Sequence, residues 1–280
     1  MKNIFATIIL ALLPIAASPQ KVIYTSADSI RIEKILQRST NNGNAGDIII
    51  AIANEFIGEK YVGGVLERDT KEPLYISCTE LDCTTFVELV LAIAKTADDG
   101  NYRFTDVCHN LETIRYRNGK NNGYSSRLHY ISWWIKDNAK TGIIEDATPK
   151  ISKERLLLNL NFMSSPPDRY PQLAENPDLV KEIEQREIPY RGIETHYIPT
   201  EKLGYNEINN IKAGDVIAIT TSTPGLDVAH IGIAYYNNST LCLIHASKKK
   251  GKVVKENIPL RDYLVNNKRH TGIMVFRAWC

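Results

Sequence analysis

Two hydrophobic periods, found in separate parts of the chain, restrict the fold more than any other feature of the sequence. In TELDCTTFVELVLAIAKT, residues 79–96, the side chains of Phe86, Val90 and Ile93 share one helical face. Residues 28–39 and 47–58 also favour helices. The last stretch of about eighty residues instead contains five short segments rich in β-branched and aromatic residues, with turn signals such as TPGLD, NNS and KKKGK between them. The five predicted strands are GDVIAITT, AHIGIAYYN, TLCLIHAS, KVVKENI and GIMVFRAW. N-terminal helices packed on a C-terminal antiparallel sheet, an α+β fold, are therefore predicted.

The first residues favour export. MKNIFATIILALLPIAASPQ places Lys2 before an apolar run that ends in small residues, which predicts a signal peptide at residues 1–18, cleaved near Ala17 or Ser18. The run is short for a membrane span, and no cysteine follows it to carry a lipid. We expect an exported protein of the periplasm or cell envelope, without stable membrane insertion.

The mature chain is predicted to be a single domain over residues 19–280, with a long mixed insertion at about 100–205. The insertion has no clean hydrophobic period and no separate apolar core of its own. A hydrophobic content of 43% is ordinary for a globular protein, and a net charge of +2 without a basic, aromatic-rich stripe gives no indication of nucleic-acid binding. The lysines at positions 248–250 and 252 are interpreted as a solvated turn. The sequence does not indicate an oligomeric state.

The number of cysteines is odd, which leaves at least one unpaired in an exported chain. The five are Cys78, Cys83, Cys108, Cys242 and Cys280. Cys242 fits a buried small hydrophobe. Cys108 is rejected as a nucleophile because its neighbour His109 would point away from it on a helix and no base-bearing strand is indicated nearby.

Cys83 stands where a reactive thiol is favoured, at the start of the best helix, which either Asp82 or Thr84 can cap. The peptide N–H groups and dipole there favour a thiolate, lower its pKa and can stabilise an oxyanion. His230, in AHIGIAYY, and His245, in LIHAS, lie on adjacent predicted strands, so one imidazole can serve as base while the other orients it. The alternatives are a structural cysteine, free or joined to Cys78, and histidines that are only packed or exposed.

The order of five segments resembles a known family. GEKYVGG, LDCTTFVE, KAGDVIAI, AHIGIAYY and LIHAS resemble, in sequence, segments of the NlpC-type cell-wall cysteine amidases and peptidases, over residues 55–95 and 210–276. SRLHYISWWI and GLDVAHIGIA are similar to the N-acetylmuramoyl-L-alanine amidase-like branch. The chain departs from the family in the long separation of Cys83 from His230 and in the threonines that follow the cysteine, where Ser-Gly is usual.

The resemblance implies a papain-like core and a catalytic triad. By it, Cys83 attacks an amide carbonyl, His230 is the base and His245 orients His230. No metal or other cofactor is implied. The substrate would be peptidoglycan or a muropeptide, cut between N-acetylmuramic acid and L-alanine.

Several side chains are predicted to contact such a substrate. Tyr61 is a candidate oxyanion donor, and Asp227 is a turn residue that can reach the substrate. A cationic and aromatic wall is expected from the SRLHYISWWI segment, because arginine pairs with carboxylates and aromatic rings stack on sugars. Its members are Arg127, His129, Tyr130, Trp133 and Trp134. The alternative for the tryptophans is helix core, and for Arg127 a surface charge.

Three competing functions remain. The same triad suits an endopeptidase that cuts between D-glutamate and the diamino acid of the stem peptide. A non-catalytic peptidoglycan-binding module would be expected to lack the nucleophile or the base. A zinc site made of Cys83, His230 and His245 has suitable ligands but lacks a closely spaced ligand pair.

Overall fold

The computed structural model describes residues 21–39, 43–69 and 71–279. The predicted signal peptide and Cys280 lie outside these residues. The α-helices of the described residues are α1 (Ser26–Arg38), α2 (Ala45–Asn54), α3 (Cys83–Asp98), α4 (Phe104–Arg115), α5 (Ile131–Lys140), α6 (Thr148–Ile151), α7 (Pro171–Ala174), α8 (Pro177–Glu187), α9 (Tyr205–Ile208) and α10 (Leu260–Val265). The strands are β1 (Val22–Ile23), β2 (Lys60–Tyr61), β3 (Leu74–Tyr75), β4 (Glu80–Leu81), β5 (Ile144–Asp146), β6 (Arg155–Asn159), β7 (Arg191–His196), β8 (Ile198–Pro199), β9 (Val216–Thr221), β10 (Val228–Asn237), β11 (Thr240–Ser247), β12 (Lys252–Lys255) and β13 (His270–Ala278).

The main sheet has the strand order β4-β2-β12-β11-β10-β9-β13-β5, with β8 also paired to β13. The long strands β9 to β13 are antiparallel to their neighbours, whereas β2 and β4 are parallel. Both the α+β class and the five C-terminal strands were predicted from the sequence and are confirmed.

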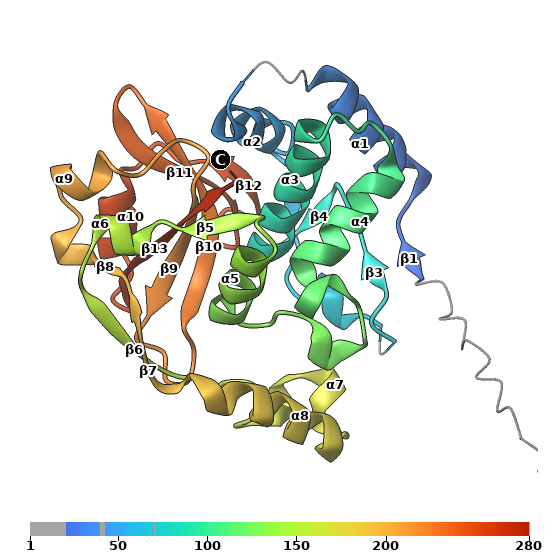
Figure 1. Ribbon diagram of the computed structural model, residues 1–280, viewed down its shortest axis with the longest axis vertical. Coiled ribbons are helices and arrows are strands. Elements are labelled where there is room, and N and C mark those ends of the chain that lie inside the picture. The colour runs from blue at the N-terminus through green and yellow to red at the C-terminus, as the bar shows by residue number, and fades with distance from the viewer. Residues whose placement is uncertain (1–20, 40–42, 70, 280) are drawn as a thin grey trace, which may run out of the picture.

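Helices cover both faces of this sheet. In Figure 1, α1 to α4, in blue to green, lie to one side of β9–β13, and α6, α9 and α10 lie to the other. The alternation along β9 explains this, because Val216 and Ala218 pack into the core on the α3 side, whereas Ile217 and Ile219 pack with Leu260 and Leu264 of the short α10. Sheets buried on both faces read as continuous apolar runs, as VIAI does.

The central helix α3 packs against β10 and β11 and against α1, α2 and α4. Leu89 and Ala97 on it are 2% and 1% exposed, and its side chains from Thr85 to Ala94 are all buried. A helix that is apolar on nearly all sides belongs in the interior. Its first residue, Cys83, is partly exposed and so remains accessible at the end of a rigid element.

The segment 100–205 supplies parts of the main sheet and core, as well as elements outside them. Its α4 packs on α3, its β5 and β8 pair with β13, and Trp133 lies in the main core. The hairpin of β6 and β7 is a separate two-stranded sheet, and α7 and α8 lie at the lower edge in Figure 1. The interpretation of residues 19–280 as one domain with an insertion stays a prediction.

Candidate active site

Cys83 is the first residue of α3, and the residues around it fix that start. Asp82 is the N-cap: its Oδ1 accepts a hydrogen bond from the Thr85 N–H at 2.8 Å, and the Thr85 hydroxyl oxygen accepts one from the Asp82 N–H at 2.9 Å. This reciprocal capping box ends the approach segment and begins the helix at the thiol. Asp82 was one of two caps predicted, and it is confirmed.

The two histidines are brought together by a hairpin. Asn238 and Ser239 connect β10 to β11 with φ values of 45° and 71°, the left-handed conformation that a two-residue hairpin turn requires. The resulting register pairs Ile233 with Ile244. The same register continued by one residue places His245 opposite Gly232. Because Gly232 is two positions after His230, the imidazoles of His230 and His245 lie on the same face of the sheet.

Gly232 is the residue that makes room between them. A Cβ atom at Gly232 would lie 3.0 Å from the Cβ of His245 and 3.0 Å from the carbonyl oxygen of Ile244. Any larger residue at this position would require His245 or the neighbouring strand to shift by a few tenths of an ångström. The glycine of the AHIGIAYY segment therefore has a steric role in the site.

The histidines form a directed hydrogen-bonded chain. Nε2 of His230 lies 2.5 Å from Nδ1 of His245, and Nε2 of His245 lies 3.2 Å from Oε1 of Glu256. His245 is fully buried and Glu256 is 3% exposed, whereas His230 is partly exposed. Because Nε2 of His230 is engaged, Nδ1 is the nitrogen left to act on another group.

Cys83 lies at the open end of this chain. The backbone N–H of Ile231, the residue after His230, lies close enough to the sulfur to favour its thiolate form, although burial outweighs this effect. The ring of Tyr263 lies 6.5 Å from that of His230 and 5.4 Å from that of His245. Its hydroxyl is also near Cys83, because a thiolate at Cys83 adds to the effect of burial in raising the pKa of Tyr263. Cys83, His230 and His245 thus occupy one site.

The electrostatics of the site favour neutral partners at rest. Burial, together with the neighbouring Asp82 carboxylate, raises the pKa of the Cys83 thiol to about 11. Burial and the neighbouring His245 lower the pKa of His230 to about 3. The prediction that the helix start would lower the thiol pKa is wrong for the resting site, because desolvation and an adjacent acid outweigh the helix N-terminus. The thiol must therefore lose its proton as it attacks.

Tyr61 lies beside the thiol. Burial and the nearby Cys83 and Asp82 raise the pKa of its phenol to about 12, so the hydroxyl keeps its proton at neutral pH. A protonated phenol is a hydrogen-bond donor. Tyr61, on β2, therefore keeps a hydrogen-bond donor near Cys83.

A cavity of about 200 Å³ adjoins Cys83 through its two chain neighbours, Asp82 and Thr84. Three of the residues predicted to contact substrate line it, namely Arg127, His129 and Tyr130. Another cavity, of about 620 Å³, is lined by Asp98 at the far end of α3. At 1.5 Å per residue that end is roughly 22 Å from Cys83, so the smaller cavity is the one the thiol can serve.

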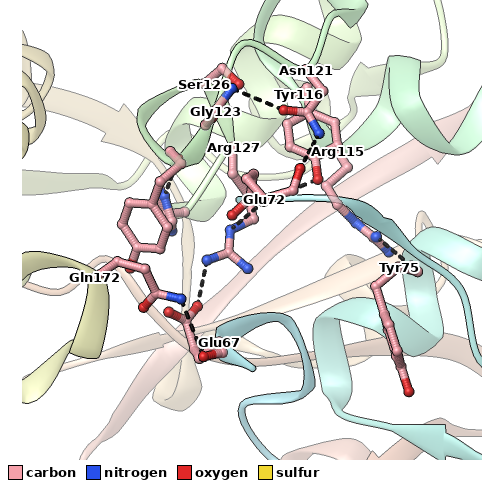
Figure 2. Close-up of polar contacts among 12 residues, drawn as sticks. Glu67, Glu72, Tyr75, Arg115, Tyr116, Asn121, Gly123, Ser126, Arg127 and Gln172 are labelled. Atoms are coloured by element: carbon pink, nitrogen blue, oxygen red, sulfur yellow. Dashed lines mark hydrogen bonds and ion pairs between the residues drawn. The ribbon is translucent and has the colours of Figure 1, made fainter. Parts of the chain in front are cut away.

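Arg127 is not a free cation in this cavity. Its guanidinium contacts Glu67 at 2.5 Å and Glu72 at 3.4 Å, as Figure 2 shows, and its side chain is 6% exposed. Desolvation opposes its charge, but the carboxylates of Glu72 and Glu67 outweigh that effect and raise its pKa. The wall that the sequence predicted to be cationic thus pairs its arginine with Glu67, which also lines the cavity, and with the buried Glu72 behind it.

The network continues behind this wall. The Tyr116 hydroxyl donates to Glu72 at 3.0 Å, and Arg115 pairs with Glu88 at 2.7 Å with both side chains 2% exposed (Figure 2 draws Arg115, Tyr116 and Glu72). His129 Nε2 lies 2.8 Å from the Tyr124 carbonyl oxygen, and burial together with Arg127 lowers its pKa well below the usual value. His129 therefore presents a neutral imidazole.

Two predicted contacts lie elsewhere. Trp134 is 1% exposed and packs in the main core, which agrees with the alternative of a core residue and leaves no ring face for a sugar. Asp227 is 2% exposed and its Oδ2 accepts a hydrogen bond from the Ser132 N–H at 2.6 Å. That bond anchors the first turn of α5. The Tyr130 hydroxyl donates to Glu187 at 2.6 Å and accepts from the Met163 N–H at 2.9 Å, so its polar group is already paired within the protein.

The described residues contain no group of three His, Cys, Asp or Glu side chains arranged to hold a metal ion. Nε2 of His230 and Nδ1 of His245 are hydrogen-bonded to each other, so neither of these two nitrogens is available to bind a shared metal ion. Cys78, Cys83, Cys108 and Cys242 are all free thiols. Every helix that the structure describes is too short or too polar to span a bilayer.

Sequence reasoning missed three groups of this site. Glu256 falls within KVVKENI, which was predicted to be strand throughout, whereas β12 ends at Lys255 and Glu256 turns inward. Tyr263 comes from α10, which was not predicted. Glu67 and Glu72 come from a loop about 60 residues before Arg127, and no local pattern marks them as its partners.

The comparisons with known proteins identify the family of this chain. A family model described as AmiA-like, N-acetylmuramoyl-L-alanine amidase-like, matches residues 51–273. A crystal structure of an N-acetylmuramoyl-L-alanine amidase from Bacteroides uniformis is 42% identical, covers 85% of this chain and 100% of its own, and superimposes with a TM-score of 0.81. No functionally curated protein matches the chain.

Two further solved structures share the fold. A Bacteroides fragilis protein named as a candidate xylanase is 44% identical over 81% of this chain and 99% of its own, with a TM-score of 0.78. A Legionella pneumophila protein is 24% identical over 90% of this chain and 94% of its own, with a TM-score of 0.68. The family model spans most of the described chain and includes Cys83, His230 and His245. The chain therefore belongs to the AmiA-like, N-acetylmuramoyl-L-alanine amidase-like family.

Proposed function

We propose that this chain is a cysteine-dependent N-acetylmuramoyl-L-alanine amidase with a papain-like, NlpC-type core. It would be exported through its N-terminal signal and release stem peptides from peptidoglycan or muropeptides in the periplasm or cell envelope. The observation that carries the proposal is the 2.5 Å hydrogen bond from His230 to His245 beside the thiol that begins α3. A nucleophile, a base and an orienting group in this order are what acyl transfer by cysteine requires.

The first half-reaction forms a thioester. Nδ1 of His230 takes the proton of the Cys83 thiol as the sulfur attacks the carbonyl carbon of the lactyl group. With a thiol pKa of about 11 and an imidazole pKa of about 3, this transfer accompanies attack and does not precede it. The tetrahedral intermediate then expels the amino group of L-alanine, which receives the proton from His230.

The second half-reaction is hydrolysis. Water attacks the thioester while His230 takes one of its protons, and the thiolate that leaves is protonated again by His230. The products are N-acetylmuramic acid, as the free lactyl acid, and the intact stem peptide. His245 holds the ring of His230 in one orientation through both steps.

The oxyanion of each tetrahedral intermediate needs donors. The Cys83 backbone N–H, at the start of α3, is one candidate, and the Tyr61 hydroxyl is the other. The raised pKa of Tyr61 supports this role, because an ionised phenol could not donate. Removal of one such donor typically lowers kcat by about 10²- to 10³-fold.

The substrate would extend into the cavity lined by Arg127, His129 and Tyr130. Its wall also contains Glu67, Asp82 and Glu88, so the acidic groups outnumber the one arginine. A substrate carboxylate would have to compete with Glu67 and Glu72 for Arg127. Uncharged amide and hydroxyl groups of the substrate meet no such competition, and we assign that wall to them.

Product identification tests the function. Wild type and the variants Cys83→Ala and Cys108→Ala are incubated with a muramoyl tetrapeptide, and the products are identified by mass. We expect free tetrapeptide and the muramic sugar from wild type and Cys108→Ala, and no cleavage by Cys83→Ala. Cys108 is the matched control because it is also a free, partly exposed thiol.

Each other result has a definite meaning. Release of a muramoyl dipeptide by wild type would replace the amidase assignment by an endopeptidase with the same nucleophile. Cleavage by Cys83→Ala would remove Cys83 from the mechanism. Binding of the muropeptide without cleavage by wild type would indicate a non-catalytic binding module.

A further inference from the structure

Glu256 ends the hydrogen-bonded chain that begins at His230. Its Oε1 lies 3.2 Å from Nε2 of His245, and its Oε2 accepts from the Lys250 ammonium group at 2.6 Å. The Tyr235 hydroxyl donates to its backbone carbonyl. These contacts join Glu256 to β10, to β11 and to the turn before β12. The lysine run that the sequence presented as a solvated turn is exposed, and one of its members, Lys250, contacts the buried carboxylate of Glu256.

The chain of contacts allows only one set of proton positions. An ionised carboxylate can only accept, so Nε2 of His245 must carry a proton. A neutral imidazole has a single N–H, which leaves Nδ1 of His245 as an acceptor. The 2.5 Å contact then takes its proton from Nε2 of His230, and Nδ1 of His230 is bare. A bare Nδ1 is the form that can take the thiol proton.

The charge states agree with this reading. Burial alone would raise the pKa of the Glu256 carboxyl, but hydrogen bonds from Lys250 and His245 outweigh it and the pKa is lowered. Burial lowers the pKa of His245 below its usual value, despite the hydrogen bond to Glu256. At neutral pH Glu256 is thus ionised and His245 is neutral.

We propose that Glu256, held by Lys250, is a positioning residue that fixes the tautomer of His245 and thereby leaves Nδ1 of His230 free to accept the proton of Cys83. The inference rests on the proposed function of the Cys83 site. It adds two residues behind the triad, neither of which touches substrate.

The variant Glu256→Gln tests it, because the ammonium of Lys250 is a donor only. The amide must turn its oxygen to Lys250 and its NH₂ to His245, which requires a bare Nε2 on His245. The tautomers of both histidines then reverse, and His230 presents an N–H to Cys83. We expect kcat to fall about 10²- to 10⁴-fold with little change in KM, as when a triad histidine is held in the wrong tautomer.

The double variant Glu256→Gln/Lys250→Met distinguishes tautomer control from mere packing. Without the ammonium, the amide oxygen can face His245 again, so we expect at least a tenfold recovery of kcat over the single variant. Lys250→Met alone should change kcat less than tenfold, because the carboxylate remains. A double variant as inactive as Glu256→Gln would overturn the proposal.

The tautomers can also be read directly, without substrate. In ¹⁵N-labelled protein, NMR correlations of the imidazole nitrogens should show His245 protonated at Nε2 in wild type and at Nδ1 in Glu256→Gln. Unchanged tautomers in Glu256→Gln would overturn the proposal even if its activity fell. This readout holds whichever bond the enzyme cuts, so failure of the proposed amidase function is seen separately, in the products of the wild-type reaction. Thermal unfolding midpoints confirm that each variant is folded.

Discussion

Alkylation of Cys83 by iodoacetamide measures the charge state on which the proposed mechanism depends. With a pKa of about 11, about one Cys83 thiol in three thousand is ionised at pH 7.5. An ordinary cysteine with a pKa of about 8.5 would be about one-tenth ionised at the same pH. Because only the thiolate reacts, we expect the rate at Cys83 to rise about tenfold for each pH unit from 7.5 to 10, without a plateau.

The variant Asp82→Asn changes this profile in a defined direction. Asparagine keeps an oxygen that can cap α3, but it removes the negative charge that helps to raise the thiol pKa. Alkylation at pH 8.5 should therefore be about three- to tenfold faster, the effect of removing one neighbouring charge. Asp106→Asn, at the start of α4, is the control and should leave the rate unchanged.

The assay is site-resolved mass spectrometry of the peptide that contains Cys83, which separates it from Cys78 and Cys108. A rate that reaches its plateau below pH 8 would contradict a resting thiol that is protonated at neutral pH. It would show that the resting site already holds a thiolate paired with an imidazolium on His230.

Two further predictions concern stability. The folded-state pKa of His230, about 3, lies below its unfolded value of 6.5, so wild type loses stability as the pH falls below about 6.5. In urea denaturation, His230→Asn should lose about 1.6 kcal/mol less than wild type between pH 6.5 and 5. An equal loss in the two proteins would contradict burial of a neutral imidazole. Arg115→Met leaves the buried Glu88 unpaired and should lower the free energy of unfolding by about 3–5 kcal/mol. Arg68→Met, the control, breaks the exposed pair with Glu80 and should lower the free energy of unfolding by less than about 1 kcal/mol. Similar losses for the two arginine variants would show that Glu88 is relieved in another way.

The sequence was sufficient where a local pattern decides the structure. The apolar faces of residues 79–96 predicted α3, and Asp82 and Thr84 were its two candidate caps, because caps and helical periods act within one or two turns. The NNS turn predicted the hairpin of β10 and β11, and a two-residue turn sets the register that places His230 and His245 on one face. The three proposed catalytic residues follow from these short-range rules together with the family resemblance.

The rest depends on contacts between segments that are distant in the sequence. Arg127 was predicted to face substrate as a free cation, and nothing near it in the sequence indicates that Glu67 and Glu72 are its partners. The thiol pKa is raised by desolvation, which requires knowledge of what packs around α3. The β6–β7 hairpin has no alternating apolar face: Leu157 and Ile193 are 57% and 42% exposed, so its strands carry no period to detect.

The most direct test of the account is the mass of the intact protein after rapid acid quenching of a reaction with muramoyl tetrapeptide. If Cys83 attacks the lactyl carbonyl, we expect an acyl adduct on Cys83 with the mass of the N-acetylmuramic acid acyl group alone. The reason is that the thioester keeps the part of the substrate on the carbonyl side of the cut bond. An adduct that includes L-alanine and D-glutamate would contradict the assigned bond. Turnover with no adduct on Cys83 at any quench time, together with cleavage by Cys83→Ala, would contradict the nucleophile.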